Sequence, residues 1–506
     1  MVRLTDLVSA LGGSAHGPTG SATLDPELAG VHLDSRLVER GSLFCALPGA
    51  VHDGLDHARA ALERGAVALL APDASRERAL RFAAEVPVWL HDEARRATGE
   101  GAALVYGRPS RDLLTFAVTG TNGKTTVAHV IAHLLRAAGR DPGVVGTVGN
   151  QVSGAAPLAA HNTTPDATAL QRLCRAHRDA GGDCLVTEAS SHALDQHRLA
   201  GFEVDIAVFT NLTRDHLDYH GSMEAYADAK AKLFESLREG GHAILPAGDP
   251  SCEAVVQRFA DIARERGAQV HTYSIGSRAD LSATRWDVVP MGINSFLDGM
   301  GISWESLVLP LIGVHNLANA LAALAAVLVS GASPSALRSG LATVSCVTGR
   351  LEPVHAAGAE FGVFVDFAHT PDALRAALSA LRGQVEASGS AGRVICVFGC
   401  GGEKDQGKRP LMGRVASELS DLVVLTSDNP RSEDPLAIIE QARAGIPNGT
   451  QVVVEPDRRA AIEHALGAAR AGDLVLLAGK GHEDTQELGD RVIPFSDREV
   501  AREVLS

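Results

Sequence analysis

The stretch FAVTGTNGKTTVAHVIAHLL, residues 116–135, decides how this chain is built. An apolar, strand-like run enters a glycine-rich turn, and the chain leaves the turn with apolar residues at helical spacing. A strand, a turn ending in GKT and a helix together predict a phosphate-binding loop. The common pattern GxxxxGK[ST] places a glycine five residues before Gly123, where this chain has Val118. The loop is therefore of a shorter kind.

The residues of this loop suit the phosphates of a nucleotide. Gly120 and Gly123 allow a tight turn whose backbone N–H groups point at an anion, and the helix N-terminus adds partial positive charge. Lys124 supplies a cation for the β and γ phosphates, and Thr125 supplies an oxygen for Mg²⁺. A plain glycine turn with a helix cap is the alternative, but GKTT directly after an apolar strand favours phosphate binding.

Length, composition and charge limit the class of protein. The chain has 506 residues, of which 45% are hydrophobic and 4% aromatic, and this favours about three domains built of α/β layers. The net charge of −15 makes binding to nucleic acid or insertion at an anionic membrane unexpected. Seven cysteines without a CxxC pair indicate reduced thiols. Together with the lack of a secretory signal pattern, they predict a cytoplasmic location.

Apolar, strand-like runs alternate with helical ones, a pattern typical of parallel sheets with crossover helices. Breaks rich in glycine, proline and serine divide this pattern. We predict three α/β domains: residues 1–105, residues 106–346 with a central P-loop-type ATPase sheet, and residues 347–506, which are Rossmann-like. In the last of these, four strands each run into a polar turn, which places ligand-binding groups at one edge of the sheet.

Two further stretches carry candidate metal ligands. CLVTEASSH delivers Glu188 at the end of a strand, and TNLTRDHLDYH gathers Asp215, His216, Asp218 and His220 in one turn. Carboxylate oxygens suit Mg²⁺, whereas His216 and His220 have the spacing of a zinc pair without the glutamate of HExxH. A capped helix start with a charged, solvated face explains the same residues. The residues alone leave these choices open.

A set of longer motifs resembles the Mur ligases, ATP-dependent enzymes that form amide bonds in peptidoglycan synthesis. In family order they are TGTNGKTT, EASSHAL, NLTRDHLDYH, GVHNLANALAA, GRLEPV, VDFAHTPDAL and GKGHED, and they cover nearly the whole chain. HNTTPD, FGCGGEKDQGKRPLMG and DNPR resemble the members that add a diamino acid to UDP-N-acetylmuramoyl-L-alanyl-D-glutamate. The resemblance implies that ATP phosphorylates the D-glutamate side-chain carboxylate and that an amine then attacks the acyl phosphate.

The resemblance also implies a nucleotide and metal site. ATP is expected to contact Gly120, Thr121, Asn122, Gly123, Lys124, Thr125, Thr126, Asn316, Asn319, Arg350 and Asp366. Mg²⁺ is expected at Thr125, Glu188, His216 and Lys230. Lys230 matches a lysine that is carbamylated in the family, and carbamylation turns a cation into a carboxylate-like ligand. Lys124, Lys230 and His216 are therefore the expected catalytic residues.

Two substrate sites are implied in the same way. The UDP-sugar peptide is expected at Ser35, Asn162, Thr163, Thr164, Ser190, Gln196 and Arg198. The diamino acid is expected at Lys404, Asp428, Asn429, Pro430, Arg431, Gly479 and Glu483. In the family, DNPR is typical of members that take meso-diaminopimelate, because the arginine of this motif binds the extra carboxylate of that amino acid. The family generally has arginine in place of Lys404, so L-lysine and L-ornithine stay open as second choices.

Three other classes of function compete with this interpretation. A folylpolyglutamate or cyanophycin-type ligase shares the ATP motifs but lacks LDSR in the N-terminal part and DNPR. A nucleotide-switched binding protein would hydrolyse ATP without needing an amino acid. A zinc hydrolase built on His216 and His220 would act without ATP. We expect a ligase that works as a monomer.

Overall fold

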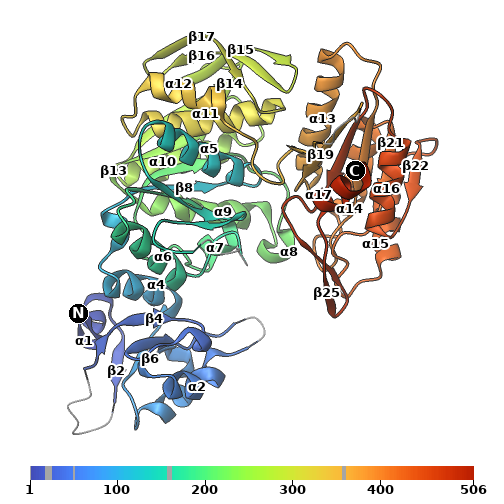
Figure 1. Ribbon diagram of the computed structural model, residues 1–506. Helices are drawn as coiled ribbons and strands as arrows, with labels where there is room; N and C mark the ends of the chain where they lie inside the picture. The colour runs from blue at the N-terminus through green and yellow to red at the C-terminus, as the bar shows by residue number, and fades with distance from the viewer. Residues whose placement is uncertain (1, 18–24, 50–51, 157–161, 356–359) are drawn as a thin grey trace.

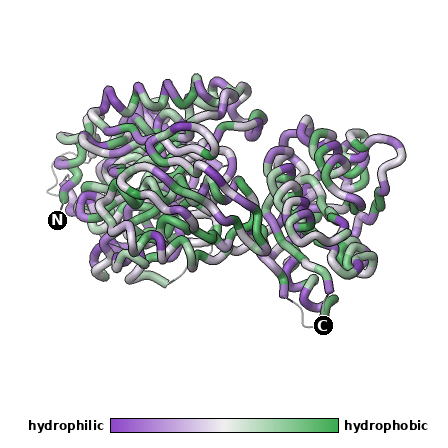
Figure 2. The backbone as a smooth tube through the Cα atoms, turned by 90° about the horizontal axis from the view of Figure 1, so that it is seen from above, coloured by the Kyte–Doolittle hydropathy of each residue, from purple (hydrophilic) through white to green (hydrophobic). Residues whose placement is uncertain are grey.

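The computed structural model describes residues 2–17, 25–49, 52–156, 162–355 and 360–506. Three α/β units follow one another along the chain, with the N-terminal and C-terminal units against different parts of the central one (Figure 1). Figure 2 shows the C-terminal unit beside the larger body that the other two form. The predicted three-domain α/β fold is confirmed. The predicted boundaries after residues 105 and 346 fall between the sheets, and their exact positions stay predictions.

The N-terminal unit is built on a five-stranded sheet in the order β2-β7-β6-β5-β4, in which only β2 runs antiparallel to its neighbour. The central strand of this sheet reads AVALLAP, the apolar run typical of a parallel strand buried on both faces. The elements are β1 (Val2–Arg3), α1 (Leu4–Leu11), β2 (Ser14–His16), β3 (Glu27–Leu28), β4 (Gly30–His32), β5 (Ser42–Cys45), α2 (Ala58–Glu63), β6 (Ala66–Pro72), α3 (Arg76–Ala79), β7 (Val88–His91) and α4 (Ala94–Val105).

The central unit contains a ten-stranded sheet in the order β10-β9-β11-β8-β12-β13-β14-β15-β16-β17. It is parallel from β9 to β15 and antiparallel at both ends. The elements are β8 (Leu114–Thr119), α5 (Lys124–Ala137), β9 (Pro142–Gly146), β10 (Gly149–Gln151), α6 (Ala167–Asp179), β11 (Cys184–Glu188), α7 (Ser191–Asp195), β12 (Val204–Phe209), α8 (Leu217–His220), α9 (Met223–Glu235), β13 (Leu237–Pro246), α10 (Glu253–Glu265), β14 (Gln269–Ile275), β15 (Leu281–Val289), β16 (Gly292–Gly299), β17 (Ile302–Leu309), α11 (Val314–Leu328) and α12 (Pro334–Thr343).

The C-terminal unit has a six-stranded sheet in the order β18-β19-β23-β20-β21-β22, parallel except for β18. The elements are β18 (Glu352–Pro353), β19 (Gly362–Asp366), α13 (Pro371–Ala387), β20 (Val394–Phe398), α14 (Lys408–Leu419), β21 (Leu422–Leu425), α15 (Pro435–Arg443), β22 (Val452–Val454), α16 (Arg458–Ala468), β23 (Leu474–Ala478), β24 (Thr485–Leu488), β25 (Arg491–Pro494) and α17 (Asp497–Leu505).

Strand β8 lies in the interior of the central sheet, with a hydrophobic core on each face. Phe116 and Val118 pack with α5 and α11 on one side, and Ala117 packs with α6, α9 and α10 on the other. The alternation follows from the two-residue period of a strand. Because β11, β8 and β12 are parallel neighbours, the turns that follow them open at the same edge of the sheet.

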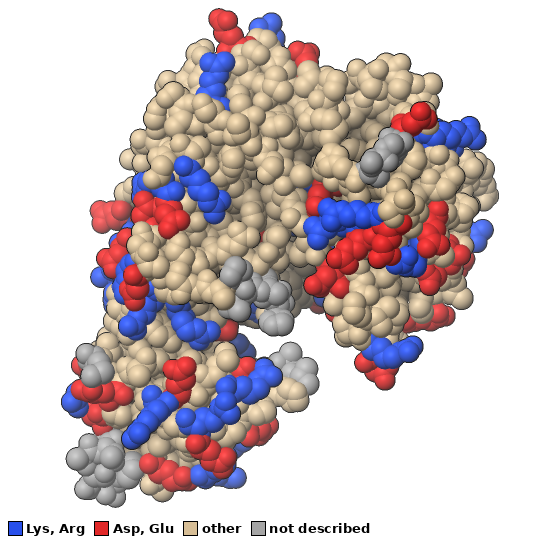
Figure 3. Space-filling view, viewed as in Figure 1, with Lys and Arg blue, Asp and Glu red and all other residues tan. Residues whose placement is uncertain are grey.

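The surface carries charged side chains of both signs. On the face in Figure 3, acidic and basic side chains are interspersed, and a recess opens between the N-terminal and C-terminal units. Among the described helices, none is both long and apolar enough to cross a membrane. All seven cysteines are free thiols, and six of them are buried.

A buried ion pair in the C-terminal unit carries a stability prediction. The Arg458 guanidinium donates to both carboxylate oxygens of Asp497 at 2.7 and 2.6 Å, and both side chains are fully buried. We expect Arg458→Met to lower the free energy of unfolding by about 3–5 kcal/mol, because it leaves a buried carboxylate without its partner. Urea denaturation followed by circular dichroism measures the loss.

Two control variants make this prediction specific. Arg459, the next residue, is half exposed and pairs with Glu503, so Arg459→Met should change stability by less than about 0.5 kcal/mol. The double variant Arg458→Met with Asp497→Leu should recover much of the loss, because no unpaired charge remains. Equal stability of Arg458→Met and Arg459→Met would contradict the prediction.

Candidate active site

The phosphate loop leaves β8 in a conformation that requires glycine. Gly120 has φ +148°, and a Cβ atom there would lie 1.8 Å from Oγ1 of Thr210. The Lys124 ammonium donates to the carbonyl oxygens of Gly120 and Thr121, at 2.9 Å each, and so lies folded over the loop. Burial lowers the pKa of Lys124. The predicted turn, with its lysine at the start of α5, is present.

A hydroxyl and a carboxylate meet beside this loop. Thr125 Oγ1 donates to Glu188 Oε2 at 2.9 Å, and Glu188 is fully buried at the end of β11. The other Glu188 oxygen accepts from the backbone N–H of Thr147 at 2.7 Å. Oxygen donors of these two types are the ligands that Mg²⁺ prefers. Of the predicted metal ligands, the structure thus brings Thr125 and Glu188 into direct contact.

The other two predicted metal ligands, Lys230 and His216, make no hydrogen bond to Thr125 or Glu188 in the described structure. Lys230, on α9, is 1% exposed, and its amine donates to the Gly120 carbonyl at 2.8 Å. Burial and the nearby Lys124 charge hold the pKa of Lys230 well below its usual value. His216 caps α8 with φ +54°, and burial lowers the pKa of its ring, so both groups favour their uncharged forms.

Zinc ligation by His216 and His220 finds no further support in the geometry. The described residues contain no group of three or more His, Cys, Asp or Glu side chains that could hold a metal ion. His220 Nε2 is instead 3.0 Å from the Ser191 hydroxyl.

A cavity of about 270 Å³ lies between the phosphate loop and the C-terminal unit. The predicted ATP residues that line it are Asn122, Gly123, Thr126, Asn316, Asn319, Arg350 and Asp366. The first turns of α13, Tyr273 and the residues that follow β12 also line it. Arg350 reaches across from the C-terminal unit and donates to Thr125 Oγ1 at 3.0 Å. The cavity is thus lined by residues of both units, as expected for a nucleotide bound between them.

Most of the predicted UDP-sugar peptide residues form one hydrogen-bonded network. Arg198 donates to the Thr164 carbonyl at 2.8 Å and to the Gln196 side chain at 2.8 Å, and the Thr164 hydroxyl is 3.3 Å from that of Ser190. The Thr163 hydroxyl accepts from Thr147, which also contacts Glu188. This network therefore abuts the candidate metal site.

Ser35 and Asn162 stand apart from this network. Ser35 begins a short 3-10 helix at Ser35–Leu37 in the N-terminal unit, and Asn162 is exposed. Neither side chain makes a hydrogen bond to the other five predicted residues in the described structure. Their grouping with that network stays a prediction.

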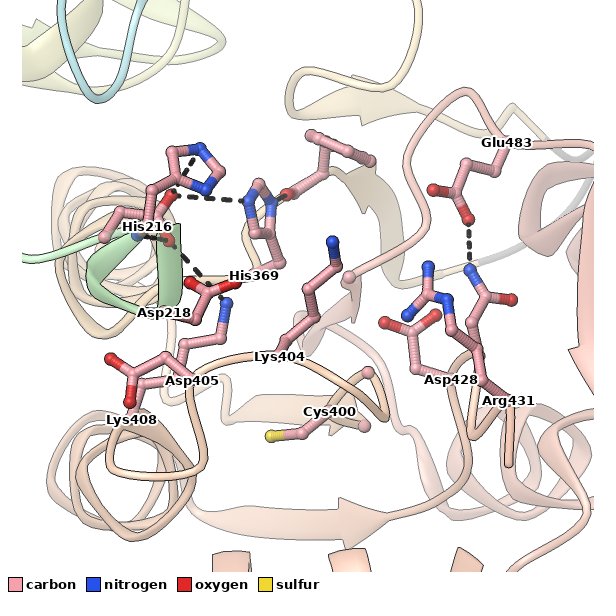
Figure 4. Close-up of a pocket in the computed structure, with 16 residues that line it drawn as sticks. His216, Asp218, His369, Cys400, Lys404, Asp405, Lys408, Asp428, Arg431 and Glu483 are labelled. Carbon is pink, nitrogen blue, oxygen red and sulfur yellow. Dashed lines mark hydrogen bonds and ion pairs between the residues drawn. The ribbon is translucent and has the colours of Figure 1, made fainter. Parts of the chain in front are cut away.

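A second pocket, of about 150 Å³, lies between the central and C-terminal units (Figure 4). The predicted amino-acid residues that line it are Lys404, Asp428, Asn429, Arg431, Gly479 and Glu483. They come from the turns after β20, β21 and β23, which are neighbours in the sheet. Pro430 lies in the same turn as Arg431 but does not line the pocket. Asp215 and His216 form the opposite wall.

This pocket carries cations and acidic groups at different places. The Lys404 ammonium points into it (Figure 4), and Arg431 is held by Glu487, at 2.8 Å, and by the Gly402 carbonyl. Asp428 has a buried oxygen, Oδ1, that finds no hydrogen-bond partner among the described residues, and burial raises the pKa of this carboxyl. Buried acceptors normally receive a hydrogen bond, so this oxygen indicates a hydrogen-bond donor on the ligand that binds here.

Four of the residues that join the two units here, Arg214, His369, Asp405 and Lys408, were not among the candidate site residues. The Asp215 carboxylate lies 3.9 Å from His369 Nε2 and 3.9 Å from the Lys408 ammonium, both of the C-terminal unit. Next to it, Arg214 pairs with Asp405 at 3.2 Å. All lie in motifs that the sequence analysis quoted, but a single sequence does not say which side chains meet across domains.

Comparison with known proteins assigns the chain to a family. Residues 27–106 match the description "Mur ligase family, catalytic domain", residues 118–327 "Mur ligase middle domain", and residues 349–481 "Mur ligase, glutamate ligase domain". A protein of Gloeobacter violaceus is 44% identical over 482 residues, which cover 95% of this chain and 94% of that protein. The chain belongs to the Mur ligase family. As a Mur ligase it is an ATP-dependent ligase.

Other relatives of this Mur ligase agree. A Synechococcus elongatus protein is 44% identical, covering 96% of this chain and 95% of that protein. It and the Gloeobacter protein are named UDP-N-acetylmuramoyl-L-alanyl-D-glutamate--2,6-diaminopimelate ligase. A solved structure of that name is 35% identical with a TM-score of 0.64, and 94% of each chain is covered. A folylpolyglutamate synthase of Mycobacterium tuberculosis, 21% identical with a TM-score of 0.62 and covering 81% of this chain and 94% of that one, shares the fold alone.

Proposed function

We propose that this Mur ligase joins meso-diaminopimelate to the D-glutamate of UDP-N-acetylmuramoyl-L-alanyl-D-glutamate in peptidoglycan synthesis. Relatives of that name match almost the full length of the chain. The observation that carries the proposal is the second pocket, which faces the turn of His216 on one side and gathers Lys404, Arg431, Asp428 and Glu483 on the other. A diamino acid bound there lies beside the proposed site of phosphate transfer.

The reaction proceeds in two steps. An oxygen of the D-glutamate side-chain carboxylate attacks the γ phosphorus of ATP, the bond to the β-phosphate oxygen breaks, and ADP leaves. The amine nitrogen then attacks the acyl carbon, the carbon–oxygen bond to phosphate breaks, and the amine loses a proton. Lys124 and Arg350 face the loop from both sides and offset the developing phosphate charge. Most of the rate enhancement therefore comes from positioning and charge neutralisation.

Thr125, Glu188, His216 and a carbamylated Lys230 would hold Mg²⁺, which when bound offsets phosphate charge. The contact between the Thr125 hydroxyl and the buried Glu188 carboxylate supports this proposal, and so does the lowered pKa of His216, which favours the neutral ring that binds metals. Lys230 is a buried amine whose low pKa favours the unprotonated form that reacts with carbon dioxide. The neutral amine and carbon dioxide form a nitrogen–carbon bond with release of one proton, and the resulting carbamate places a negative charge next to Lys124.

The choice of amino acid rests on cations that can hold a second carboxylate. Arg431 keeps its guanidinium at the pocket wall by contacts to Glu487 and Gly402. Lys404 supplies a second positive charge but no forked pair. Meso-diaminopimelate has a carboxylate at each end, whereas L-lysine and L-ornithine have one. The two cations therefore favour diaminopimelate, and Lys404 is the reason to test the other two amines.

The UDP-sugar peptide is proposed to bind along Thr163, Thr164, Ser190, Gln196 and Arg198, with Ser35 and Asn162 completing the site. The first five are tied together next to Glu188, which is where the D-glutamate carboxylate must arrive. We further propose that the enzyme acts in the cytoplasm as a monomer, since both substrates and ATP are soluble and every site lies within one chain.

The test is phosphate release with ATP, Mg²⁺ and UDP-N-acetylmuramoyl-L-alanyl-D-glutamate, with meso-diaminopimelate, L-lysine or L-ornithine added in parallel and the product identified by mass. We expect turnover with diaminopimelate and little with the other two. Preference for L-lysine or L-ornithine would overturn the choice of amino acid. Release of phosphate that needs no amine would favour a nucleotide switch and overturn the ligase.

A further inference from the structure

Lys480 is a buried cation at the acidic end of the amino-acid pocket; it lies in the motif GKGHED, but neither the expected site residues nor the mechanism above includes it. It lies two residues after the end of β23, and its side chain is fully buried. The next residue, Gly481, has φ +53°, and a Cβ atom there would lie 2.6 Å from the Cβ of Phe367. This tight turn fixes the backbone at Lys480 and holds its side chain inside the protein.

The ammonium of Lys480 joins the three acidic or amide groups of the pocket. It donates to Glu483 Oε2 at 2.8 Å and to Asn429 Oδ1 at 3.2 Å, and it lies 3.7 Å from Asp428 Oδ1. Asn429 in turn donates from Nδ2 to Glu483 Oε2 at 3.0 Å. All three partners line the pocket, whereas Lys480 itself does not. The lysine thus lies behind the pocket wall and acts through residues that face the ligand.

Two physical effects follow from this position. A buried ammonium costs desolvation free energy, so it is retained only where its hydrogen bonds and ion pairs compensate for that cost. Here they fix the carboxylate of Glu483 in one orientation. Its positive charge, 2.8 Å from Glu483 and 3.7 Å from Asp428, also offsets part of the negative charge at the end of the pocket that receives the substrate ammonium.

We propose that Lys480 is a positioning residue for the diamino acid: it orients Glu483 and Asn429 and sets the charge of the pocket end that receives the substrate ammonium. This inference rests on the proposed function. Lys480 would hold the acidic end of the site in its binding conformation before the substrate arrives. Its loss should therefore change the KM for the diamino acid and leave the KM values for the other two substrates unchanged.

The experiment compares Lys480→Met with the wild-type enzyme in the full ligation assay. Loss of charge-assisted hydrogen bonds predicts a KM for meso-diaminopimelate at least about tenfold higher. The KM values for ATP and for the UDP-sugar peptide should stay within about twofold, since Lys480 contacts neither of those sites. Lys480→Gln keeps a hydrogen-bond donor without the charge, so its KM for meso-diaminopimelate should lie between the values of wild type and Lys480→Met. It replaces Lys480→Met as the test variant if the methionine variant folds poorly. Arg459→Met, which removes an exposed cation of the same unit, is the matched control and should match wild type.

A double-mutant cycle separates positioning from a general structural role. If Lys480 acts through Glu483, the effect of Lys480→Met on the KM for diaminopimelate should shrink at least about threefold in the Glu483→Gln background. An unchanged KM for diaminopimelate, or an equal rise in the KM of all three substrates, would overturn the inference. If the wild-type enzyme itself forms no amide, the proposed function fails instead, so the two failures are distinguishable.

Discussion

Replacing Lys124 with methionine is expected to lower kcat for ligation by about a thousandfold or more, because a preorganised cation at the phosphates is lost. The side chain lies folded over the phosphate loop, bonded to the carbonyls of Gly120 and Thr121, from where it can turn to an anion. Methionine keeps the length and apolar character of the stem. The measurement is steady-state phosphate release with saturating diaminopimelate.

The matched control lies on the same helix. Arg136 is an exposed residue in the last turn of α5, so Arg136→Met removes a cation far from the loop and should retain wild-type kcat. Circular dichroism of both variants checks that α5 is intact. A Lys124→Met enzyme with more than about a tenth of wild-type kcat would contradict the role given to the loop.

Replacing Arg431 with alanine is expected to raise the KM for meso-diaminopimelate about 30-fold or more, because the guanidinium that pairs with the second carboxylate of the substrate is lost. Arg431 lines the pocket with φ +52° and is held from behind by Glu487 and Gly402, so its position is fixed before substrate binds. L-Lysine lacks the second carboxylate, so its KM should change much less. The measurement is the ratio of kcat/KM for the two amines.

Two further variants sharpen this prediction. Arg431→Lys keeps the charge but loses the forked geometry, so its KM for meso-diaminopimelate should lie between the values of wild type and Arg431→Ala. Arg443, an exposed arginine on α15, is the control, because Arg443→Ala removes a cation outside the pocket. An equal loss of kcat/KM for diaminopimelate and for L-lysine would mean that Arg431 stabilises the loop without binding the second carboxylate.

The sequence was sufficient for the fold class and for residues that lie within one motif. The phosphate loop could be predicted because its glycines, lysine and threonine are adjacent in the chain and their chemistry is local. The amino-acid residues were found in three separate turns only through the family resemblance. Their common place was predictable, because β20, β21 and β23 are parallel and their C-terminal ends meet at one edge.

Contacts between domains could not be predicted in this way. The approach of His369 and Lys408 to Asp215 depends on how two separately folded units pack, and no periodicity in the sequence encodes that. Lys480 was missed for a different reason: a lysine between two glycines is typical of an exposed turn, and only the structure places it inside. Ser35 lies on the N-terminal unit, outside the network formed by Thr164 and Arg198.

The acyl phosphate is the central claim, and isotope transfer tests it most directly. The D-glutamate side-chain carboxylate of the UDP-sugar peptide is labelled with ¹⁸O, the enzyme is supplied with ATP, Mg²⁺ and meso-diaminopimelate, and the released phosphate is analysed by mass. Attack of a carboxylate oxygen on the γ phosphorus predicts one ¹⁸O atom in each phosphate released from fully labelled substrate. Phosphate without the label, formed together with the amide product, would contradict the account.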